Sequence, residues 1–241
     1  SRFHCWKDGG HGNMNMTEAI MHSCNTYFYT ISKRIGIDKI AEMARRFGLG
    51  KEIGTILTGE KPGLIPDSAW KKKRYNEEWQ TGDTLSAGIG QGYMLTTPLQ
   101  LAMMVARVGG GTMVLPNFIK REEGEPEPTF EKYNIPKEHF ALVREGMRRV
   151  VNVPGGTAYG SRILSDKYSM CGKTGTSQVI SKKGLKSAIG SMTEAEKAKM
   201  QNHAIFVGYG PVENPTYAIS VLIEHGGGGS KAAAPVAKDV M

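Results

Sequence analysis

Two apolar runs near the C-terminal end constrain the fold of this chain more than any other sequence feature. They cover residues 204–209 and 217–223, and the short link PVENP lies between them. Runs of this length, joined by a link with Pro and Asn, are typical of neighbouring antiparallel strands. A third extended segment, residues 168–180, contains the sequence KTGTSQVI. We therefore expect a small antiparallel sheet that other parts of the chain must cover.

Several helical patterns supply this cover. Apolar residues recur at helical spacing, between recognisable start and stop signals, in residues 17–21, 27–35, 38–47, 99–108, 137–151 and 230–240. Asp38 is expected to cap the third of these helices. Helices before and after a run of strands predict an α+β fold, with helices packed on the sheet in a single domain.

Three other segments lack such periodicity. Residues 50–92 and 121–136 are rich in Gly, Pro and charge, which predicts ordered loops. The Lys-rich insert 181–202 lies between strands and is expected to be partly helical. Asp83 and the glycine-rich run 88–92 are expected to border a cleft as structural support.

Composition narrows the class of protein. The chain has 241 residues, 39% of them hydrophobic, which is enough for one large domain. The net charge is +8, and the densest basic run is Lys71–Arg74. Because no nucleic-acid-binding module accompanies this run, we expect no nucleic-acid partner. A basic surface suits anionic membrane or cell-wall polymers equally well. The chain begins with neither Met nor a leader, so we expect it to be an internal piece of a longer protein.

The sequence Gly172-Lys173-Thr174 resembles the end of a phosphate-binding loop. That motif needs another glycine at the position of Lys167, and the intervening residues are no glycine-rich cradle. Nucleotide hydrolysis is therefore not expected.

A strand that lines a cleft explains the residues 173–176 (KTGT) better. Gly175 has no Cβ, so a substrate backbone can approach it closely. Lys173 and the two threonine hydroxyls can bind a carboxylate, and a backbone N–H on such a strand can serve an oxyanion hole. Far upstream, Ser23 and Asn25 stand one residue apart at a break between two helices, where both side chains are expected to project to the same side.

Ser–x–Asn followed much later by Lys–Thr–Gly is the pairing of penicillin-binding proteins and serine β-lactamases. Three longer stretches extend the likeness: SCNTYFYTISKRIGIDKIAEMARRFGLG, GDTLSAGIGQGYMLTTPLQLA and CGKTGTSQV. On these motifs the chain resembles the class B penicillin-binding protein transpeptidases. The GGHG at residues 9–12 and the WKKKRY at residues 70–75 resemble the penicillin-binding protein 2 group of the elongation machinery most closely.

The resemblance covers nearly the whole chain. It implies the penicillin-binding/β-lactamase-like transpeptidase fold, an antiparallel sheet flanked by helices, here truncated at its N-terminus. Residues 1–241 would be the C-terminal portion of a single transpeptidase domain.

The resemblance also implies roles for individual residues. Ser23 would relay a proton between the nucleophile and the leaving amine, and Asn25 would hold an amide carbonyl of the substrate. Lys173 would add positive potential and a hydrogen bond to Ser23. Thr174 and Thr176 would take the substrate carboxylate, and the N–H of Thr176 would supply half of the oxyanion hole.

One part of the family pattern is missing. The nucleophile of the family lies in a Ser–x–x–Lys motif upstream of Ser–x–Asn, whereas the Ser–x–x–Lys of this chain, Ser68–Lys71, follows it in a basic loop. We interpret Ser68–Lys71 as coincidental. The chain is then expected to lack the attacking serine and, by itself, not to become acylated.

Cys5, His11 and Cys24 are residue types that bind zinc. One interpretation is two small space-filling cysteines and a loop histidine. The other, which the resemblance implies, is a structural zinc that pins the GGHG loop beside the site. Its fourth ligand would lie upstream, or His4 or His22 would replace it. No cofactor is otherwise required, and three cysteines do not make a disulfide framework.

For the intact protein the resemblance implies a peptidoglycan D,D-transpeptidase. A serine would take the acyl group of a D-Ala–D-Ala stem peptide, and an amine from a neighbouring stem would accept it, while β-lactams would acylate the same serine. The location would be the periplasmic face of the cytoplasmic membrane, with membrane proteins of the elongation machinery as partners. Two alternatives stay open: a β-lactamase or D,D-carboxypeptidase, and a non-catalytic β-lactam-binding sensor or scaffold.

Overall fold

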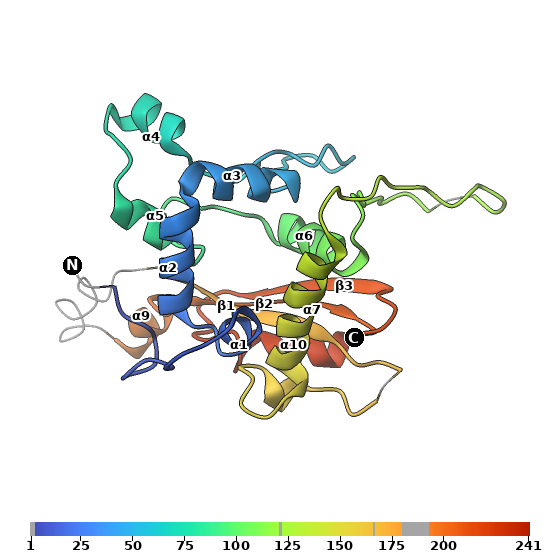
Figure 1. Cartoon of the computed structure of the whole chain (residues 1–241). Helices are drawn as coiled ribbons and strands as arrows, with labels where there is room; N and C mark the ends of the chain where they lie inside the picture. Colours follow the sequence, from blue (N-terminus) through green and yellow to red (C-terminus); the bar gives the residue numbers. More distant parts are fainter. Residues whose placement is uncertain (1–2, 121, 166, 180–192) are drawn as a thin grey trace.

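An antiparallel sheet lies at the centre of the computed structural model, which describes residues 3–120, 122–165, 167–179 and 193–241 (Figure 1). Its strands in the described residues are β1 (Cys171–Ser177), β2 (His203–Gly210) and β3 (Tyr217–Ile223), in the order β1-β2-β3. Both neighbouring pairs are antiparallel, and Phe206 pairs with Thr174 on one side and Val221 on the other. The predicted sheet is confirmed, although the strand that carries KTG is shorter than residues 168–180.

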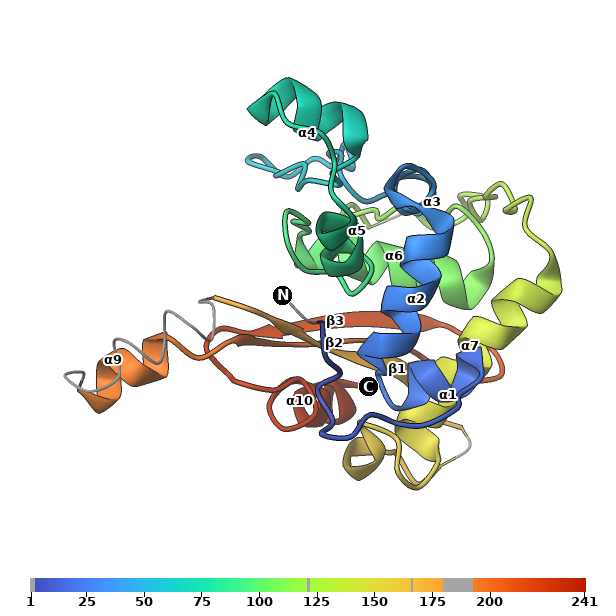
Figure 2. The same ribbon diagram turned by 60° about the vertical axis from the view of Figure 1, so that its left-hand side comes forward.

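Helices cover both faces of this sheet and extend beyond it. They are α1 (Met16–Met21), α2 (Asn25–Ile35), α3 (Ile37–Arg46), α4 (Ser68–Tyr75), α5 (Thr81–Ala87), α6 (Pro98–Gly110), α7 (Lys137–Asn152), a short 3-10 helix η1 (Tyr159–Ser161), α9 (Glu194–Lys199) and α10 (Ala233–Val240). Figure 2 shows α6 on one side of the sheet and α10 on the other, and α7 packs against β1. The chain therefore has the expected α+β arrangement.

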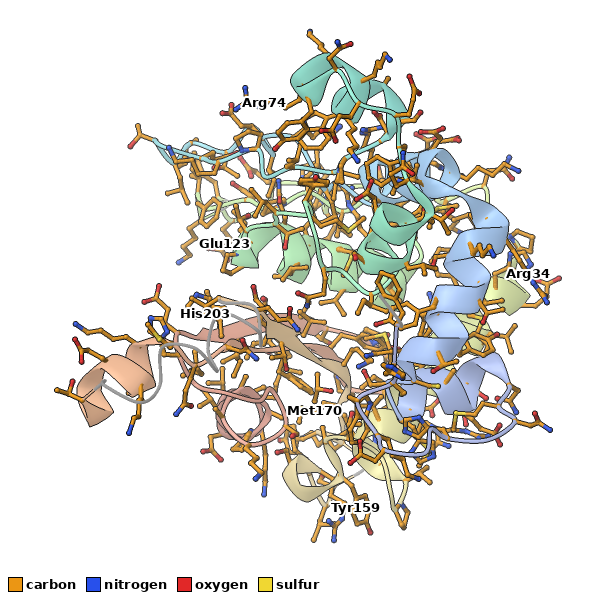
Figure 3. All side chains as sticks on the ribbon, turned by 90° about the vertical axis from the view of Figure 1, so that its left-hand side faces the viewer. Arg34, Arg74, Glu123, Tyr159, Met170 and His203 are labelled. Atoms are coloured by element: carbon orange, nitrogen blue, oxygen red, sulfur yellow. The ribbon has the colours of Figure 1, made fainter. Side chains whose placement is uncertain are left out.

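The core explains the apolar runs from which the sheet was predicted. Strand β2 is the central strand and is buried over most of its length, with Phe206 and Tyr209 almost fully enclosed. A strand covered on both faces needs apolar residues at successive positions. Met170, just before β1, is fully buried between the sheet and its helices, whereas Arg34 and Arg74 lie at the periphery (Figure 3).

Residues 50–92 are not only loop, which corrects the sequence prediction. Helix α4 begins after Asp67, whose carboxylate accepts the N–H of Trp70 at 2.7 Å, and it ends at Asn76 in the left-handed conformation. Its sequence SAWKKKRY is mostly polar and buries Lys71 instead of an apolar stripe. The second helix, α5, has seven residues. Neither helix carries the apolar periodicity on which the prediction depended.

Asp38 is not a cap, which is a second correction. Helix α3 starts at Ile37, and the carboxylate of Asp38 instead accepts the backbone N–H and the hydroxyl of Ser68 at 3.0 and 2.8 Å. Ser68 thus stands at the start of a helix and not in a loop. Lys71 lies 2.7 Å from Asp83, so Ser68 and Lys71 tie α4 to α3 and α5 through separate partners.

Part of the predicted insert, residues 180–192, lies outside the described residues. Helix α9 follows it, in agreement with the expected helical part. None of the helices in the described ranges combines the length and the apolar character needed to cross a membrane.

Candidate active site

The end of helix α1 places Ser23 in an unusual backbone conformation. The N–H of Cys24 donates to the carbonyl of Ala19 at 2.9 Å, and the N–H of Ser23 donates to that of Ile20 at 3.2 Å. This pair of bonds defines a Schellman motif, whose left-handed position is usually glycine. Ser23 occupies that position with φ of 53°. A side chain there costs about 1–2 kcal/mol, so the protein maintains a serine at this turn against its conformational preference.

Helix α2 starts immediately after the turn. Cys24 precedes its first residue, Asn25, and makes no side-chain cap. Ser23 and Asn25 both line the same cleft, as the Ser–x–Asn spacing predicted.

Lys173 on β1 faces Ser23 across this cleft. Its ammonium nitrogen lies 2.8 Å from the hydroxyl of Ser23 and 2.8 Å from the carbonyl of Thr174. Desolvation lowers the pKa of Lys173 to about 8. A substantial fraction of this amine is therefore neutral slightly above pH 7, and it can exchange a proton with the serine hydroxyl.

The cleft has a volume of about 630 Å³ and is lined by residues from both halves of the chain. Strand β1 contributes Lys173, Thr174, Gly175 and Thr176, and the helical half contributes Ser23, Asn25 and Phe28. The hydroxyl of Thr174 lies 3.0 Å from that of Thr157, which orients it. Among the described residues, neither Ser68 nor Lys71 lines this cleft.

Gln91 attaches the loop after α5 to the edge of β1. The loop turns at Gly90, which has φ of 73°, and the N–H of Gln91 donates to the carbonyl of Ser86 at 2.9 Å. The side-chain amide of Gln91 then donates to the carbonyl of Thr176 at 2.8 Å. The glycine-rich run therefore does more than border the cleft, because it fixes the backbone beside the expected oxyanion donor.

Part of the cleft wall has no side chains and is formed by Gly228 and Gly229, between β3 and α10. A Cβ on Gly229 would lie 2.2 Å from the carbonyl oxygen of Ile205 and 2.5 Å from that of Gly175. Only glycine fits there without moving the sheet, whereas a Cβ on Gly228 would meet nothing within 4 Å.

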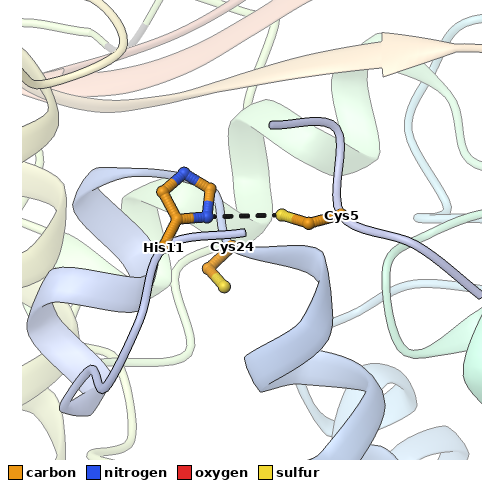
Figure 4. Close-up of side chains that lie close together, drawn as sticks. All are labelled: Cys5, His11 and Cys24. Carbon is orange, nitrogen blue, oxygen red and sulfur yellow. Dashed lines mark hydrogen bonds between the residues drawn. The ribbon is translucent and has the colours of Figure 1, made fainter. Parts of the chain in front are cut away.

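Cys5, His11 and Cys24 meet beside the turn that carries Ser23 (Figure 4). Their ligand atoms all lie within 4.8 Å of one another, and the sulfur of Cys5 is 3.3 Å from Nδ1 of His11. Tetrahedral zinc with sulfur and nitrogen ligands needs separations of about 3.5–3.8 Å. The donor types therefore fit zinc, and a closure of at most about 1 Å would bring their spacing to that of a tetrahedral site. His22 only stacks on the ring of His11, with centroids 5.8 Å apart.

The ionisation of Cys5 and His11 also suits a metal, whereas burial and the neighbouring Cys5 raise the pKa of Cys24. Burial opposes the thiolate of Cys5, but the backbone N–H groups of Lys7, Thr26 and Asn25 outweigh it and lower its pKa. Burial also lowers the pKa of His11, which keeps its ring neutral. A thiolate and a neutral imidazole are the forms that bind metal.

The model of the penicillin-binding protein transpeptidase domain matches residues 1–241. The chain belongs to the penicillin-binding protein transpeptidase family. The resemblance drawn from Ser–x–Asn and Lys–Thr–Gly is thereby confirmed, as is the expected fold.

Relatives in this transpeptidase family include the peptidoglycan D,D-transpeptidase MrdA of Haemophilus influenzae, 38% identical over all of this chain and 38% of the relative. The MrdA proteins of Salmonella typhimurium and Escherichia coli K12 are 34% and 32% identical, over 98% and 95% of this chain and 39% and 37% of the relatives. The chain thus spans 37–39% of the length of these three proteins.

Two solved structures have the same fold. Penicillin-binding protein 2 of Helicobacter pylori, in a complex with MreC, has a TM-score of 0.82 and 36% identity over 98% of this chain and 41% of that one. Penicillin-binding protein 2 of Pseudomonas aeruginosa, in a complex with WCK 5153, has a TM-score of 0.83 and 35% identity over 98% of this chain and 50% of that one. These neighbours confirm the predicted likeness to the penicillin-binding protein 2 group.

Sequence reasoning missed several residues that line the cleft, among them Trp6 and Thr157, and it gave Gln91, within the run 88–92, only a supporting role. The turn-forming glycines beside Gln91 mark a fixed loop, which is a sequence signal for a projecting side chain. No local pattern marks Trp6 or Thr157, because the fold brings them to the cleft from separate loops.

Proposed function

We propose that the protein carrying this chain is a serine-type D,D-transpeptidase that cross-links the stem peptides of peptidoglycan. The observation that carries the proposal is the 2.8 Å contact between Ser23 and Lys173, 150 residues apart, inside a cleft large enough for a peptide. Membership of the transpeptidase family and the names of its MrdA relatives support the same reaction.

The chain's residues would act on the acyl transfer as follows. The hydroxyl of Ser23 relays a proton to the leaving D-Ala amine, and Lys173 lends or takes that proton because its pKa is lowered to about 8. Asn25 holds a substrate carbonyl from the same turn. The N–H of Thr176 donates to the developing oxyanion, while the hydroxyls of Thr174 and Thr176 receive the carboxylate.

The attacking serine would come from a part of the protein outside these 241 residues. The hydroxyl of Ser68 is held by Asp38, and Lys71 is paired with Asp83, so this Ser–x–x–Lys has no free base and no place in the cleft. A fluorescent penicillin is expected to label the full-length protein covalently and to leave the 241-residue chain unlabelled. Covalent labelling of a serine within this chain would overturn the assignment.

Ser23→Ala and Lys173→Met in the full-length protein test the relay. Each is expected to slow acylation by penicillin about a hundredfold or more, the usual contribution of a general acid–base pair. Ser68→Ala is the matched control and should acylate at the normal rate. Normal acylation of Ser23→Ala would contradict the relay.

The acceptor distinguishes a transpeptidase from a hydrolase. We expect the full-length protein, given a stem peptide and an amine acceptor, to form the cross-linked product in preference to the hydrolysed one. Exclusive hydrolysis would favour a carboxypeptidase or β-lactamase. Acylation without turnover would favour a β-lactam-binding sensor.

The location and partners follow from the same proposal. The substrate lies outside the cytoplasmic membrane, so the domain would act on its periplasmic face, attached by a segment outside this chain. The Helicobacter pylori relative forms a complex with MreC, which supports an elongation-machinery membrane protein as a partner. Co-purification of the full-length protein with such a protein from membranes tests this.

We also propose a structural zinc at Cys5, His11 and Cys24, because their donor atoms lie together and the ionisation of Cys5 and His11 fits it. The metal would hold the loop 5–11 to the start of α2 and take no part in acyl transfer. Metal analysis of the full-length protein is expected to find one zinc per chain, reduced in Cys5→Ser and unchanged in Cys171→Ala, since Cys171 is buried outside the cluster. Absence of stoichiometric zinc would refute this proposal.

A further inference from the structure

We propose that Trp6 is a positioning residue whose indole N–H holds the turn of Ser23 in its active geometry. The inference rests on the proposed relay role of Ser23 and adds a residue to that site. It assigns Trp6 no contact with the reacting atoms.

The hydrogen bonds of Trp6 carry the argument. Its indole nitrogen lies 2.9 Å from the carbonyl oxygen of Ser23 and 3.2 Å from that of His22. One donor thus bridges two successive carbonyls at the C-terminal end of α1. The carbonyl of His22 is one that a helix leaves without an internal partner, and the carbonyl of Ser23 belongs to the turn just beyond the helix.

The bond from the Trp6 indole matters because of where the carbonyl of Ser23 lies in the turn. Ser23 is the left-handed residue of the turn, and its carbonyl belongs to the peptide unit that leads into Cys24 and α2. A rotation of that unit would move the Ser23 side chain away from Lys173, 2.8 Å from its hydroxyl. Because serine disfavours this conformation, an external bond to the same carbonyl is an effective way to keep it.

The surroundings of Trp6 make it a second attachment of the same turn. Trp6 follows Cys5, and its ring packs edge-on against His11 with centroids 5.3 Å apart. Cys5 and His11 also lie beside Cys24, the residue after Ser23. The loop 5–11 therefore contacts the turn through the carbonyls of residues 22–23 and through the side chain of Cys24.

Exposure sets the size of the effect. The Trp6 residue is 58% exposed, although it lines the cleft. Water can compete for a bond at such a site, so we expect the contribution of one ordinary neutral hydrogen bond and no more, about five- to tenfold in rate.

Replacement of Trp6 by 3-benzothienylalanine removes only the N–H, because sulfur takes its place in a ring of the same shape. The matched control is the same replacement at Trp79, whose indole donates to the hydroxyl of Thr84 at 2.8 Å away from the cleft. Two readouts apply, one structural and one kinetic. The zinc content of each variant is measured in parallel.

The structural readout uses the 241-residue chain. Ser23-Cys24 is its only Ser–Cys pair, so labelling Ser with ¹³C at the carbonyl and Cys with ¹⁵N gives one NMR correlation, from the peptide unit in question. We expect this signal to move on replacement of Trp6 and to stay in place on replacement of Trp79. An unmoved signal in the Trp6 variant would overturn the proposal without any assay of activity.

The kinetic readout is acylation of the full-length protein by penicillin. The Trp6 replacement is expected to lower the acylation rate constant about five- to tenfold while the noncovalent binding constant stays the same. The Trp79 replacement should change neither. An unchanged rate constant, or a loss confined to binding, would reduce Trp6 to a structural residue and refute the inference. Absence of acylation in the unmodified full-length protein would instead refute the proposed function, and the NMR result would still stand.

Discussion

The strained turn at Ser23 yields a prediction with an unusual sign. We compare Ser23→Gly with Ser23→Ala in this chain, because both lose the hydroxyl that lies 2.8 Å from Lys173. Alanine must still adopt the left-handed conformation, φ 53°, at a cost of about 1–2 kcal/mol. Glycine avoids this cost but loses about 0.5–1 kcal/mol more conformational freedom on folding.

The midpoints of the two ranges leave the glycine variant more stable than the alanine variant by about 0.75 kcal/mol. For a domain of this size that corresponds to a melting temperature higher by about 1–4 °C. Thermal unfolding followed by circular dichroism measures it, with the two variants at equal concentration and pH.

Thr30, exposed in the middle of α2, provides the matched control. In a helix interior Gly is less stable than Ala by about 1 kcal/mol, so Thr30→Gly should melt below Thr30→Ala. A glycine variant at position 23 that melts at or below its alanine counterpart would refute the assignment of strain to Ser23. Neither Ser23 variant should relay protons, so the more stable protein is also an inactive one.

Three further predictions follow. Burial lowers the pKa of Lys173 to about 8 from its usual 10.5, so the unfolded chain binds more protons than the folded chain between these pH values. The free energy of unfolding should therefore rise with pH across that window, and Lys173→Met should lose this rise. Urea unfolding at pH 7, 9 and 10 measures both. Gly229→Ala should lower the free energy of unfolding in urea by about 1–3 kcal/mol, while Gly228→Ala should change it little. Equal losses of stability in the two variants would contradict the close packing of Gly229 against the strand carbonyls. Gln91→Met, which cannot donate to the Thr176 carbonyl, should slow acylation of the full-length protein about five- to tenfold. Gln91→Glu should slow it more strongly, since its carboxylate also sets a negative charge against that carbonyl oxygen, and a normal rate in both would exclude a role for this bond.

The sequence predicted those elements whose signal is local. Strands β2 and β3 were evident because a buried central strand and its neighbour need apolar residues in succession. Helices α4 and α5 were missed because α4 buries Lys71 against Asp83, and a helix held by an ion pair and an Asp67 cap shows no apolar stripe. In such a segment the start signal at Asp67 is more informative than periodicity.

The residues of the candidate site likewise divide into those with a local sequence signal and those without one. Ser23 and Lys173 were predicted to face each other because two short motifs in a fixed order carry that information, and the structure places them in contact. The contacts of Trp6 and Thr157 depend on where separate loops pack, with no trace in neighbouring residues. The Ser–x–x–Lys of this chain is a converse case, since it lies outside the cleft and ties α4 to α3 and α5.

The glycine wall at residues 228–229 has a consequence for what can enter the site. A surface made of backbone alone offers no charge, aromatic face or flexible group by which to tell one ligand from another. It can discriminate by width, and otherwise only through hydrogen bonds to its backbone groups. Because Gly229 rests directly on the carbonyls of β1 and β2, that width is set by the sheet itself and cannot be adjusted by a change of rotamer.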